Sequence, residues 1–314
     1  QGEGEEGACA RGVPEHGRRG GRVSGGKRLS ESGVLYVVAT PIGNLGDVTE
    51  RALQVLGSVD LIAAEDTRHT RRLLAHYGLA ARLLSCHEHN EAQITPGLVE
   101  RLAAGEDVAL VADAGTPLVS DPGFPLVRAV RAAGIRVVPV PGPNAAICAL
   151  SAAGLPSDRF LFLGFPPRGR DRRRDWLAGV AAEPGTLILY EAANRALPTL
   201  EDLASALGGG RRAVLARELT KRFETLLDGT LDALAERVRA DADQRRGELV
   251  ILVEGSRDGP VPEAEGERVL RILAEQLPLK QAAALAAEIT GAKKNRLYEL
   301  GLRSHGSPPA GGSD

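Results

Sequence analysis

The first half of the chain alternates short apolar runs with amphipathic stretches of helical period. Residues 50–56, 68–76 and 126–133 carry apolar side chains at helical spacing and are therefore predicted to be helices. The apolar runs predict strands at residues 34–39, 61–65, 82–86, 108–112 and 137–140. Strands that alternate with helices form parallel sheets, so residues 33–154 are expected to make one parallel α/β domain.

The pattern changes after Gly154, where strand-like runs follow one another with fewer helical crossovers. This pattern predicts a second α/β domain with a mixed sheet, covering residues 155–256. Its strands are expected at residues 160–164, 186–190, 213–217 and 249–254.

A linker rich in Gly and Pro follows, and residues 257–303 are then expected to form a small helical C-terminal extension. Its helices are predicted at residues 264–275 and 279–289, with Gly291 as a stop and a last turn at residues 295–302. Residues 1–32 are rich in Gly, Glu and Arg, and residues 304–314 are rich in Gly, Ser and Pro. Both end segments are expected to be disordered.

The composition narrows the class of protein. A chain of 314 residues with 43% hydrophobic content can bury a large core, and its net charge of −2 confines any nucleic-acid contact to a local basic patch. Three scattered cysteines favour a reducing compartment over a disulfide framework. No apolar run approaches the length of a membrane span. We therefore expect a cytoplasmic protein with no membrane partner.

Three predicted strands of the first domain end in loops rich in Gly, Pro and polar residues. These loops are TPIGNLGD at residues 40–47, DAGTPLVSDPG at residues 113–123 and PGPNA at residues 141–145. Glycine lets a ligand approach the backbone closely, and proline stiffens the loop before anything binds. Because the carboxyl ends of parallel strands share one edge of a sheet, the three loops are expected to converge on one ligand crevice.

These loops and several further blocks resemble one known family. The blocks run in order from about Val34 to about Leu302: ATPIGNLGD, AEDTRHT, HEHNE, DAGTPLVSDPG, PGPNA, YEAANR and ARELTK. They resemble the bacterial ribosomal-RNA small-subunit methyltransferase I family, in the tetrapyrrole-methylase superfamily. The resemblance implies a two-domain tetrapyrrole-methylase-like fold and S-adenosylmethionine-dependent methylation of a cytidine 2′-hydroxyl in the decoding centre of 16S rRNA. It also implies a homodimer that acts on small-subunit rRNA or the 30S subunit.

The resemblance also assigns cofactor contacts. Gly115-Thr116-Pro117 occupies the place of the superfamily's Gly-Asp-Pro loop, which contacts the methionine portion. Pro143-Asn144-Ala145 corresponds to the loop that reaches the cofactor from the next strand, and Tyr190 lies on the strand that closes over the adenosine. The full set expected to bind the cofactor is Asp113, Gly115, Thr116, Pro117, Ser120, Pro143, Asn144, Ala145 and Tyr190.

Methyl transfer to a ribose hydroxyl needs a group that accepts the proton or a cation that stabilises the developing alkoxide. Candidate bases are Asp66, Glu191 and Asp113, and Lys221 or Arg195 could supply the charge. The sequence leaves this choice open, although Asp66 can also serve as the N-cap of the following helix. We take Asp66, Glu191 and Lys221 as the candidate catalytic set.

Basic residues mark candidate RNA contacts. The expected set is Arg68, Arg195, Lys280, Lys293, Lys294 and Arg296, four of them in the helical extension. The arginine run at residues 168–174 fits either a solvated helix start or a phosphate contact. In the CHEHNE run at residues 86–91, neighbouring residues of a strand or loop point to different sides, and two histidines two residues apart leave the remaining ligands unidentified, so no metal site is expected. A hydrogen-bonding role is favoured for that run.

Three alternatives are weighed against this interpretation. A tetrapyrrole or diphthine-type methyltransferase would favour a Gly-x-Gly-Pro-Gly first loop, whereas this chain has TPIGN at residues 40–44. A non-catalytic RNA-binding module would not need all of the cofactor loops. A dinucleotide-dependent oxidoreductase would place Gly-x-Gly-x-x-Gly after the first strand, and that motif is missing there.

Overall fold

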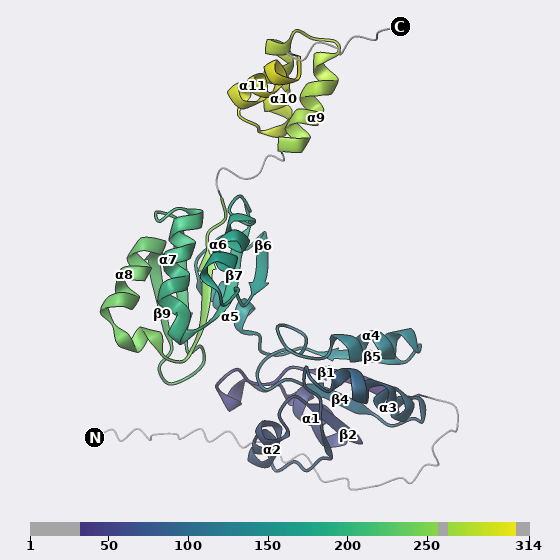
Figure 1. The fold of residues 1–314 in the computed structure, drawn as a ribbon. Coiled ribbons are helices and arrows are strands. Elements are labelled where there is room, and N and C mark those ends of the chain that lie inside the picture. The colour runs from purple at the N-terminus through teal and green to yellow at the C-terminus, as the bar shows by residue number, and fades with distance from the viewer. Residues whose placement is uncertain (1–31, 257–262, 306–314) are drawn as a thin grey trace, which may run out of the picture. The chain divides into compact units, whose positions relative to one another are not determined.

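The computed structural model describes residues 32–256 and 263–305 (Figure 1). The disorder predicted for the two ends falls almost wholly outside the described residues. At the carboxyl end the predicted boundary of the disordered tail needs correction, because helix α11 (Lys294–His305) continues two residues into that tail. In the part of the chain that the structure describes, no helix is long and apolar enough to cross a membrane.

The first sheet is parallel throughout, as predicted, with strand order β3-β2-β4-β1-β5. Its strands are β1 (Val34–Val38), β2 (Leu61–Ala64), β3 (Leu83–Ser85), β4 (Val108–Val111) and β5 (Arg136–Val140). Successive side chains of a strand point to opposite faces of the sheet. Because these strands are apolar at successive positions, helices must cover both faces. One face packs on α1 (Glu50–Ser58) and α2 (Thr67–His76), and the other packs on α3 (Glu91–Ala103) and α4 (Phe124–Ala132).

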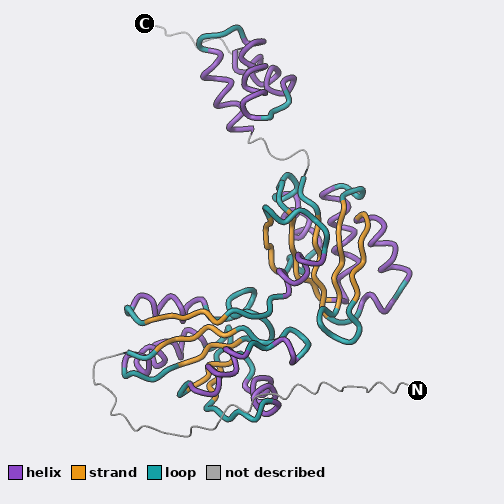
Figure 2. Tube along the Cα trace, turned by 180° about the vertical axis from the view of Figure 1, so that it is seen from behind, coloured by secondary structure: helices purple, strands orange, loops and turns teal. Residues whose placement is uncertain are grey.

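The second sheet is mixed, as predicted, with order β6-β7-β10-β8-β9. Only β6 and β7 are parallel; the other neighbours are antiparallel. One strand was not predicted: β9 is a half-exposed edge strand whose Asp228-Gly229 pair is more typical of a turn. The strands, orange in Figure 2, are β6 (Phe160–Gly164), β7 (Thr186–Ala192), β8 (Arg212–Arg217), β9 (Thr225–Thr230) and β10 (Glu248–Val253).

Helices cover both faces of the second sheet. One face packs on α6 (Arg170–Ala178), α7 (Ala196–Leu207) and α8 (Leu231–Ala240). The other face carries α5 (Ala145–Ala152), whose alanines and leucine pack on the strands. The domain boundary near Gly154 stays a prediction, and the helix just before it packs on the second sheet.

The C-terminal segment folds around its own small core. Helices α9 (Glu263–Ala274), α10 (Leu279–Thr290) and α11 bury Leu270, Ala282, Ala283, Ala286 and Leu297 between them. Gly291 ends α10 in the left-handed conformation at φ 73°, as its position in the sequence predicts. The last element is longer than the expected turn, because α11 has 12 residues.

Candidate active site

The three loops of the first sheet converge, which confirms the prediction from their order. The loop after β1 pairs with the loop after β4: the Thr40 N–H donates to the Gly115 carbonyl at 2.8 Å, and the Gly115 N–H donates to the Thr40 carbonyl at 3.0 Å. The loop after β4 also contacts the loop after β5, since the Thr116 hydroxyl donates to the Pro143 carbonyl at 3.0 Å. These hydrogen bonds fix the three loops as one unit.

The loop after β4 has an unusual backbone. Gly115 (φ 83°) and Gly123 (φ 128°) adopt left-handed or related conformations that favour glycine. Leu118 (φ 73°) and Ser120 (φ 66°) also lie in the left-handed region, which is sparsely populated by residues with a Cβ. Such positions store strain and cluster at ligand sites, where the surrounding structure holds them. The loop is therefore shaped before a ligand binds.

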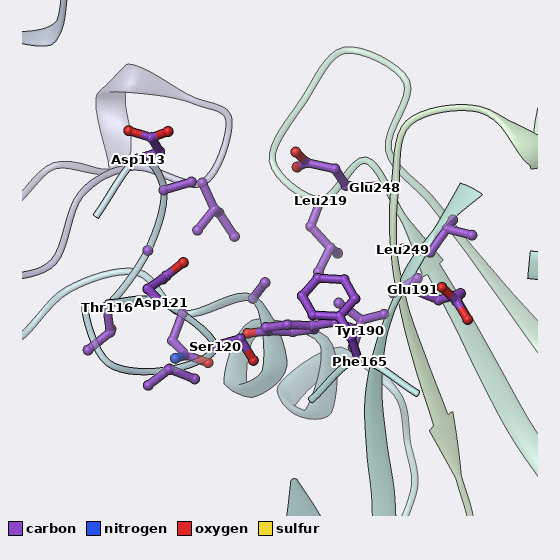
Figure 3. A pocket seen from close by; sticks show the side chains of 18 of the residues that line it. Asp113, Thr116, Ser120, Asp121, Phe165, Tyr190, Glu191, Leu219, Glu248 and Leu249 are labelled. Carbon is purple, nitrogen blue, oxygen red and sulfur yellow. The ribbon is translucent and has the colours of Figure 1, made fainter. Parts of the chain in front are cut away.

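A cavity of about 400 Å³ borders these loops, a size that suits a small ligand. Figure 3 shows several of its side chains. Seven of the residues predicted to bind the cofactor line it: Asp113, Gly115, Thr116, Ser120, Asn144, Ala145 and Tyr190. Pro117 and Pro143 are not among the lining residues, although the Pro143 carbonyl holds Thr116 in place.

Sequence reasoning missed a large part of the lining. Asp121 belongs to the β4 loop, but nothing in the motif distinguishes it from a helix-capping aspartate. Many of the other missed residues belong to the second sheet and its loops, among them Phe165, Leu219, Gly247, Glu248, Leu249 and Val250. Their approach to the first sheet depends on tertiary packing, which local patterns do not encode.

The cavity has an acidic wall. Burial raises the pKa of Asp121 to about 7, and the nearby charges of Glu65 and Asp113 add to this shift. Burial also raises the pKa of Glu65. The Asp113 N–H donates to Glu65 Oε2 at 3.2 Å, and Asp113 Oδ1 accepts from the Asp66 N–H at 3.0 Å. A cluster of carboxyl groups in a partly buried cavity favours a ligand with positive charge.

The opposite wall is aromatic. The Tyr190 hydroxyl accepts a hydrogen bond from the Ala146 N–H at 3.1 Å, which orients its ring. The rings of Phe162 and Phe165 pack edge-on against Tyr190, with centroids 4.9 and 5.5 Å away. Burial raises the pKa of Tyr190, so the hydroxyl is neutral at physiological pH. This wall suits a flat apolar group such as an aromatic base.

The three candidate catalytic side chains occupy different environments. Asp66 caps α2 and forms a salt bridge with Arg68 at 2.8 Å, and its hydrogen bond to that side chain lowers the Asp66 pKa. Lys221 Nζ lies 3.0 Å from Glu218 Oε1 and 2.9 Å from Glu248 Oε2. Burial alone would lower the pKa of Lys221, but the two carboxylates raise it overall.

Glu191 lines the cavity, but its carboxylate points away from Asp113 and Asp121 (Figure 3). Oε1 accepts from Arg195 Nε at 2.7 Å and from the Ala192 N–H at 2.8 Å, and Oε2 accepts from the Thr199 hydroxyl at 2.6 Å. The side chain is fully buried. Adjacent residues of a strand face opposite sides, so Tyr190 at the cavity places Glu191 on the other face of β7.

The candidate RNA-binding cations come from different parts of the chain and have different surroundings. Arg68 is exposed beside Asp66, and Arg195 is partly buried against Glu191. Lys280, Lys294 and Arg296 are exposed on the C-terminal helices, and Lys293 is exposed just before α11. In the arginine run at residues 168–174, Arg173 is buried and forms a 2.6 Å salt bridge with Asp202, so this residue has a structural role. Among the described residues, no group of three or more potential ligands is arranged around a metal site.

The fold and the cavity together define the class of protein. Residues 34–235 match the family described as Tetrapyrrole (Corrin/Porphyrin) Methylases. The solved structure of the methyltransferase CobJ has a TM-score of 0.55 at 21% identity, covering 72% of this chain and 95% of its own. That of diphthine synthase has a TM-score of 0.52 at 13% identity, covering 70% and 90%. The predicted tetrapyrrole-methylase fold is thus confirmed.

Relatives of higher identity identify the family. The protein named Ribosomal RNA small subunit methyltransferase I from Escherichia coli O157:H7 is 55% identical over 279 residues, covering 88% of this chain and 97% of the relative. The protein of that name from Pseudomonas aeruginosa is 56% identical over 278 residues, covering 88% and 99%. Residues 260–305 match the RsmI C-terminal HTH domain. The chain belongs to the ribosomal RNA small subunit methyltransferase I family, and S-adenosylmethionine is its cofactor.

The cavity fits this cofactor by size and by chemistry. Its volume is in the range for such ligands, its acidic wall suits the sulfonium and ammonium charges, and its aromatic wall suits the adenine ring. The residues able to hold the charged part are Asp113 and Asp121, and those able to hold the base are Phe165 and Tyr190.

One prediction follows from the raised pKa of Asp121. A bound cation favours the ionised carboxylate, so cofactor affinity should rise as the pH rises from 6 to 8, by about tenfold for one proton released. Calorimetric titration at several pH values measures this change. Asp121→Asn should bind with a nearly flat pH profile, and an unchanged slope in that variant would show that another group titrates.

Proposed function

We propose that this protein transfers a methyl group from S-adenosylmethionine to the ribose 2′-hydroxyl of a cytidine in the decoding centre of small-subunit rRNA. The observation that carries the proposal is the 55–56% identity, over nearly the whole of each relative, to proteins named Ribosomal RNA small subunit methyltransferase I. Methylation of rRNA follows from this relationship. The 2′-hydroxyl of a decoding-centre cytidine is the finer step, and it rests on the resemblance of the sequence motifs.

The proposed substrate is rRNA or the 30S subunit, and we expect a homodimer in the cytoplasm. Fold likeness to the methyltransferase CobJ and to diphthine synthase, at 21% and 13% identity, does not extend to their substrates. A tetrapyrrole or diphthine-type methyltransferase is therefore the weaker alternative. A non-catalytic RNA-binding module is also weaker, because the cofactor loops form a shaped cavity.

When bound, S-adenosylmethionine supplies an electrophilic methyl group. The proposed contacts are the predicted set in the three loops, namely Asp113, Gly115, Thr116, Pro117, Ser120, Pro143, Asn144 and Ala145, together with Tyr190 from β7. These residues would orient the cofactor and exclude water, which provides most of the rate enhancement in a displacement of this kind.

The acceptor hydroxyl must lose its proton as the new bond forms. Asp66 and Lys221 stay proposed as proton acceptor and stabilising cation, with Asp113 as a second candidate base. Asp66 is a weaker base than Asp113, because its salt bridge with Arg68 lowers its pKa, and neither Asp66 nor Lys221 is among the residues that line the cavity. Asp121 joins these candidates because its carboxyl lines the cavity and titrates near neutral pH. Glu191 is a weaker candidate, since both of its carboxylate oxygens are engaged inside the second domain.

The RNA contacts proposed are Arg68, Arg195, Lys280, Lys293, Lys294 and Arg296. Replacing Lys293, Lys294 and Arg296 together by Ala should weaken RNA binding and reduce the slope of log K against log salt by about 2, since each phosphate contact contributes roughly 0.7 to 0.9. Cofactor affinity should not change. RNA binding measured from 50 to 200 mM salt tests this, and an unaltered slope would assign these cations to the solvated surface.

The proposed reaction itself is tested with labelled cofactor. Small subunits, or naked rRNA that lacks the modification, are incubated with the protein, and the methylated nucleotide is mapped. Label on one ribose of the small-subunit rRNA supports the proposal. Label that appears only on a porphyrinoid or a protein contradicts it.

A further inference from the structure

We propose that the turn formed by residues 218–224 is a nucleotide-stacking platform, on which Phe223 and Arg222 hold a base of single-stranded RNA beside the target nucleotide. This inference rests on the proposed function, because it specifies how the same RNA substrate is held. The turn connects β8 to β9 and lies outside the three motif loops of the first sheet.

The first observation is an exposed aromatic side chain. Phe223 is 64% exposed, whereas a phenylalanine ring is usually buried in an apolar core. The Arg222 guanidinium lies over this ring, 5.5 Å from its centroid. One face of the ring is thus covered by a cation, and most of the residue remains accessible. Aromatic rings and arginine planes are the groups on which proteins stack unpaired RNA bases.

The second observation is that hydrogen bonds within the turn hold an unusual backbone conformation. Glu218 (φ 51°) and Thr220 (φ 65°) lie in the left-handed region, which is costly for residues with a Cβ. The Lys221 N–H donates to the Glu218 carbonyl at 3.0 Å, and the Thr220 N–H donates to Glu224 Oε2 at 2.6 Å. A turn held by such hydrogen bonds loses less conformational entropy when a base stacks on it than an unconstrained loop would lose.

The third observation is the position of the turn at the cavity. Leu219 lines the cavity, and so does Glu248, whose carboxylate is paired with Lys221. The turn also packs against the loop after β1, because a Cβ added to Gly43 would lie only 2.5 Å from Lys221 Cγ. Phe223 is therefore presented from the same short turn that forms part of the cavity wall. A nucleotide stacked there would adjoin a ribose at the cavity.

The pairing of a cation with an exposed ring favours RNA as the occupant. Arg222 forms no ion pair with any carboxylate among the described residues, so its charge can neutralise a phosphate. Base stacking on an aromatic side chain also tolerates different sequences, because every base has a flat face. The partner we infer is a single-stranded nucleotide flanking the methylation site.

Steady-state methylation of small-subunit RNA tests this platform. Phe223→Leu keeps an apolar side chain but removes the ring, and should raise KM for RNA about tenfold with kcat within about twofold, as expected for the loss of one stacked base. Phe223→Trp should keep the wild-type KM. Arg222→Ala should raise KM and reduce its salt dependence. Cofactor affinity should stay the same in all three variants.

Phe160→Ala is the matched control. Phe160 is also exposed, at 43%, but it begins β6 and pairs with Thr186 at the start of β7, whereas Tyr190, further along β7, lines the cavity. Its KM for RNA should not change. An unchanged KM in Phe223→Leu, or a fall in kcat with unchanged KM, would overturn the platform. If the wild-type protein methylates no RNA, the proposed function fails instead, and the two failures are thereby distinguished.

Discussion

Gly115→Val is expected to abolish measurable binding of S-adenosylmethionine, a loss of at least about a hundredfold in affinity. Gly115 has φ 83°, a conformation that a β-branched residue adopts only at a cost of about 1–3 kcal/mol. A Cβ at this position would already lie 3.3 Å from Ile42 Cγ2. The added methyl groups would obstruct the cavity or break the backbone pairing with Thr40. Calorimetry with the folded variant measures the effect.

Gly134→Val is the matched control for backbone strain. Gly134 also has a positive φ, at 72°, but a Cβ there would meet nothing within 4 Å. It lies between α4 and β5, at the end of β5 opposite to the PGPNA loop. Both variants should lose thermal stability to a similar degree, and only Gly115→Val should lose the cofactor. Equal affinity in both variants would remove the β4 loop from the site.

The convergence of the three loops could be predicted because it follows from strand order alone. Once β1, β4 and β5 are expected to be parallel, their carboxyl ends must lie on one edge, and the composition of the loops marks that edge as a ligand site. Thr116 then meets Pro143 across the crevice, as the structure confirms. Short segments of the sequence are therefore sufficient to predict this part of the site.

The second wall of the cavity could not be predicted in the same way. Phe165, Leu219 and Glu248 come from different strand ends of a mixed sheet, and no motif links their positions. The edge strand β9 was missed for a related reason: only its pairing with β8 makes a strand of the TLLDGT run. Tertiary packing overrides the local pattern in both places.

The sequence motif around Glu191 did not show which of two adjacent strand residues faces the cavity. The YEAANR block draws attention to Tyr190 and Glu191 equally, but adjacent strand residues point to opposite faces. Tyr190 faces the cavity, whereas Glu191 is buried among Arg195, Thr199 and the Ala192 N–H. Removing one partner of a buried ion pair of this kind typically costs about 3–5 kcal/mol, so a loss of activity on replacing Glu191 needs no catalytic role to explain it.

The most direct measurement uses small-subunit RNA whose target cytidine carries a 2′-deoxyribose. Methyl transfer to this RNA is expected to be eliminated, because the acceptor oxygen is missing. The RNA should still bind within about threefold of the unmodified strand, since phosphate contacts supply most of its affinity. Transfer is followed with labelled S-adenosylmethionine, and binding is measured in parallel. Methyl transfer that persists on the deoxy nucleotide would show that the acceptor is a base atom and would contradict the account.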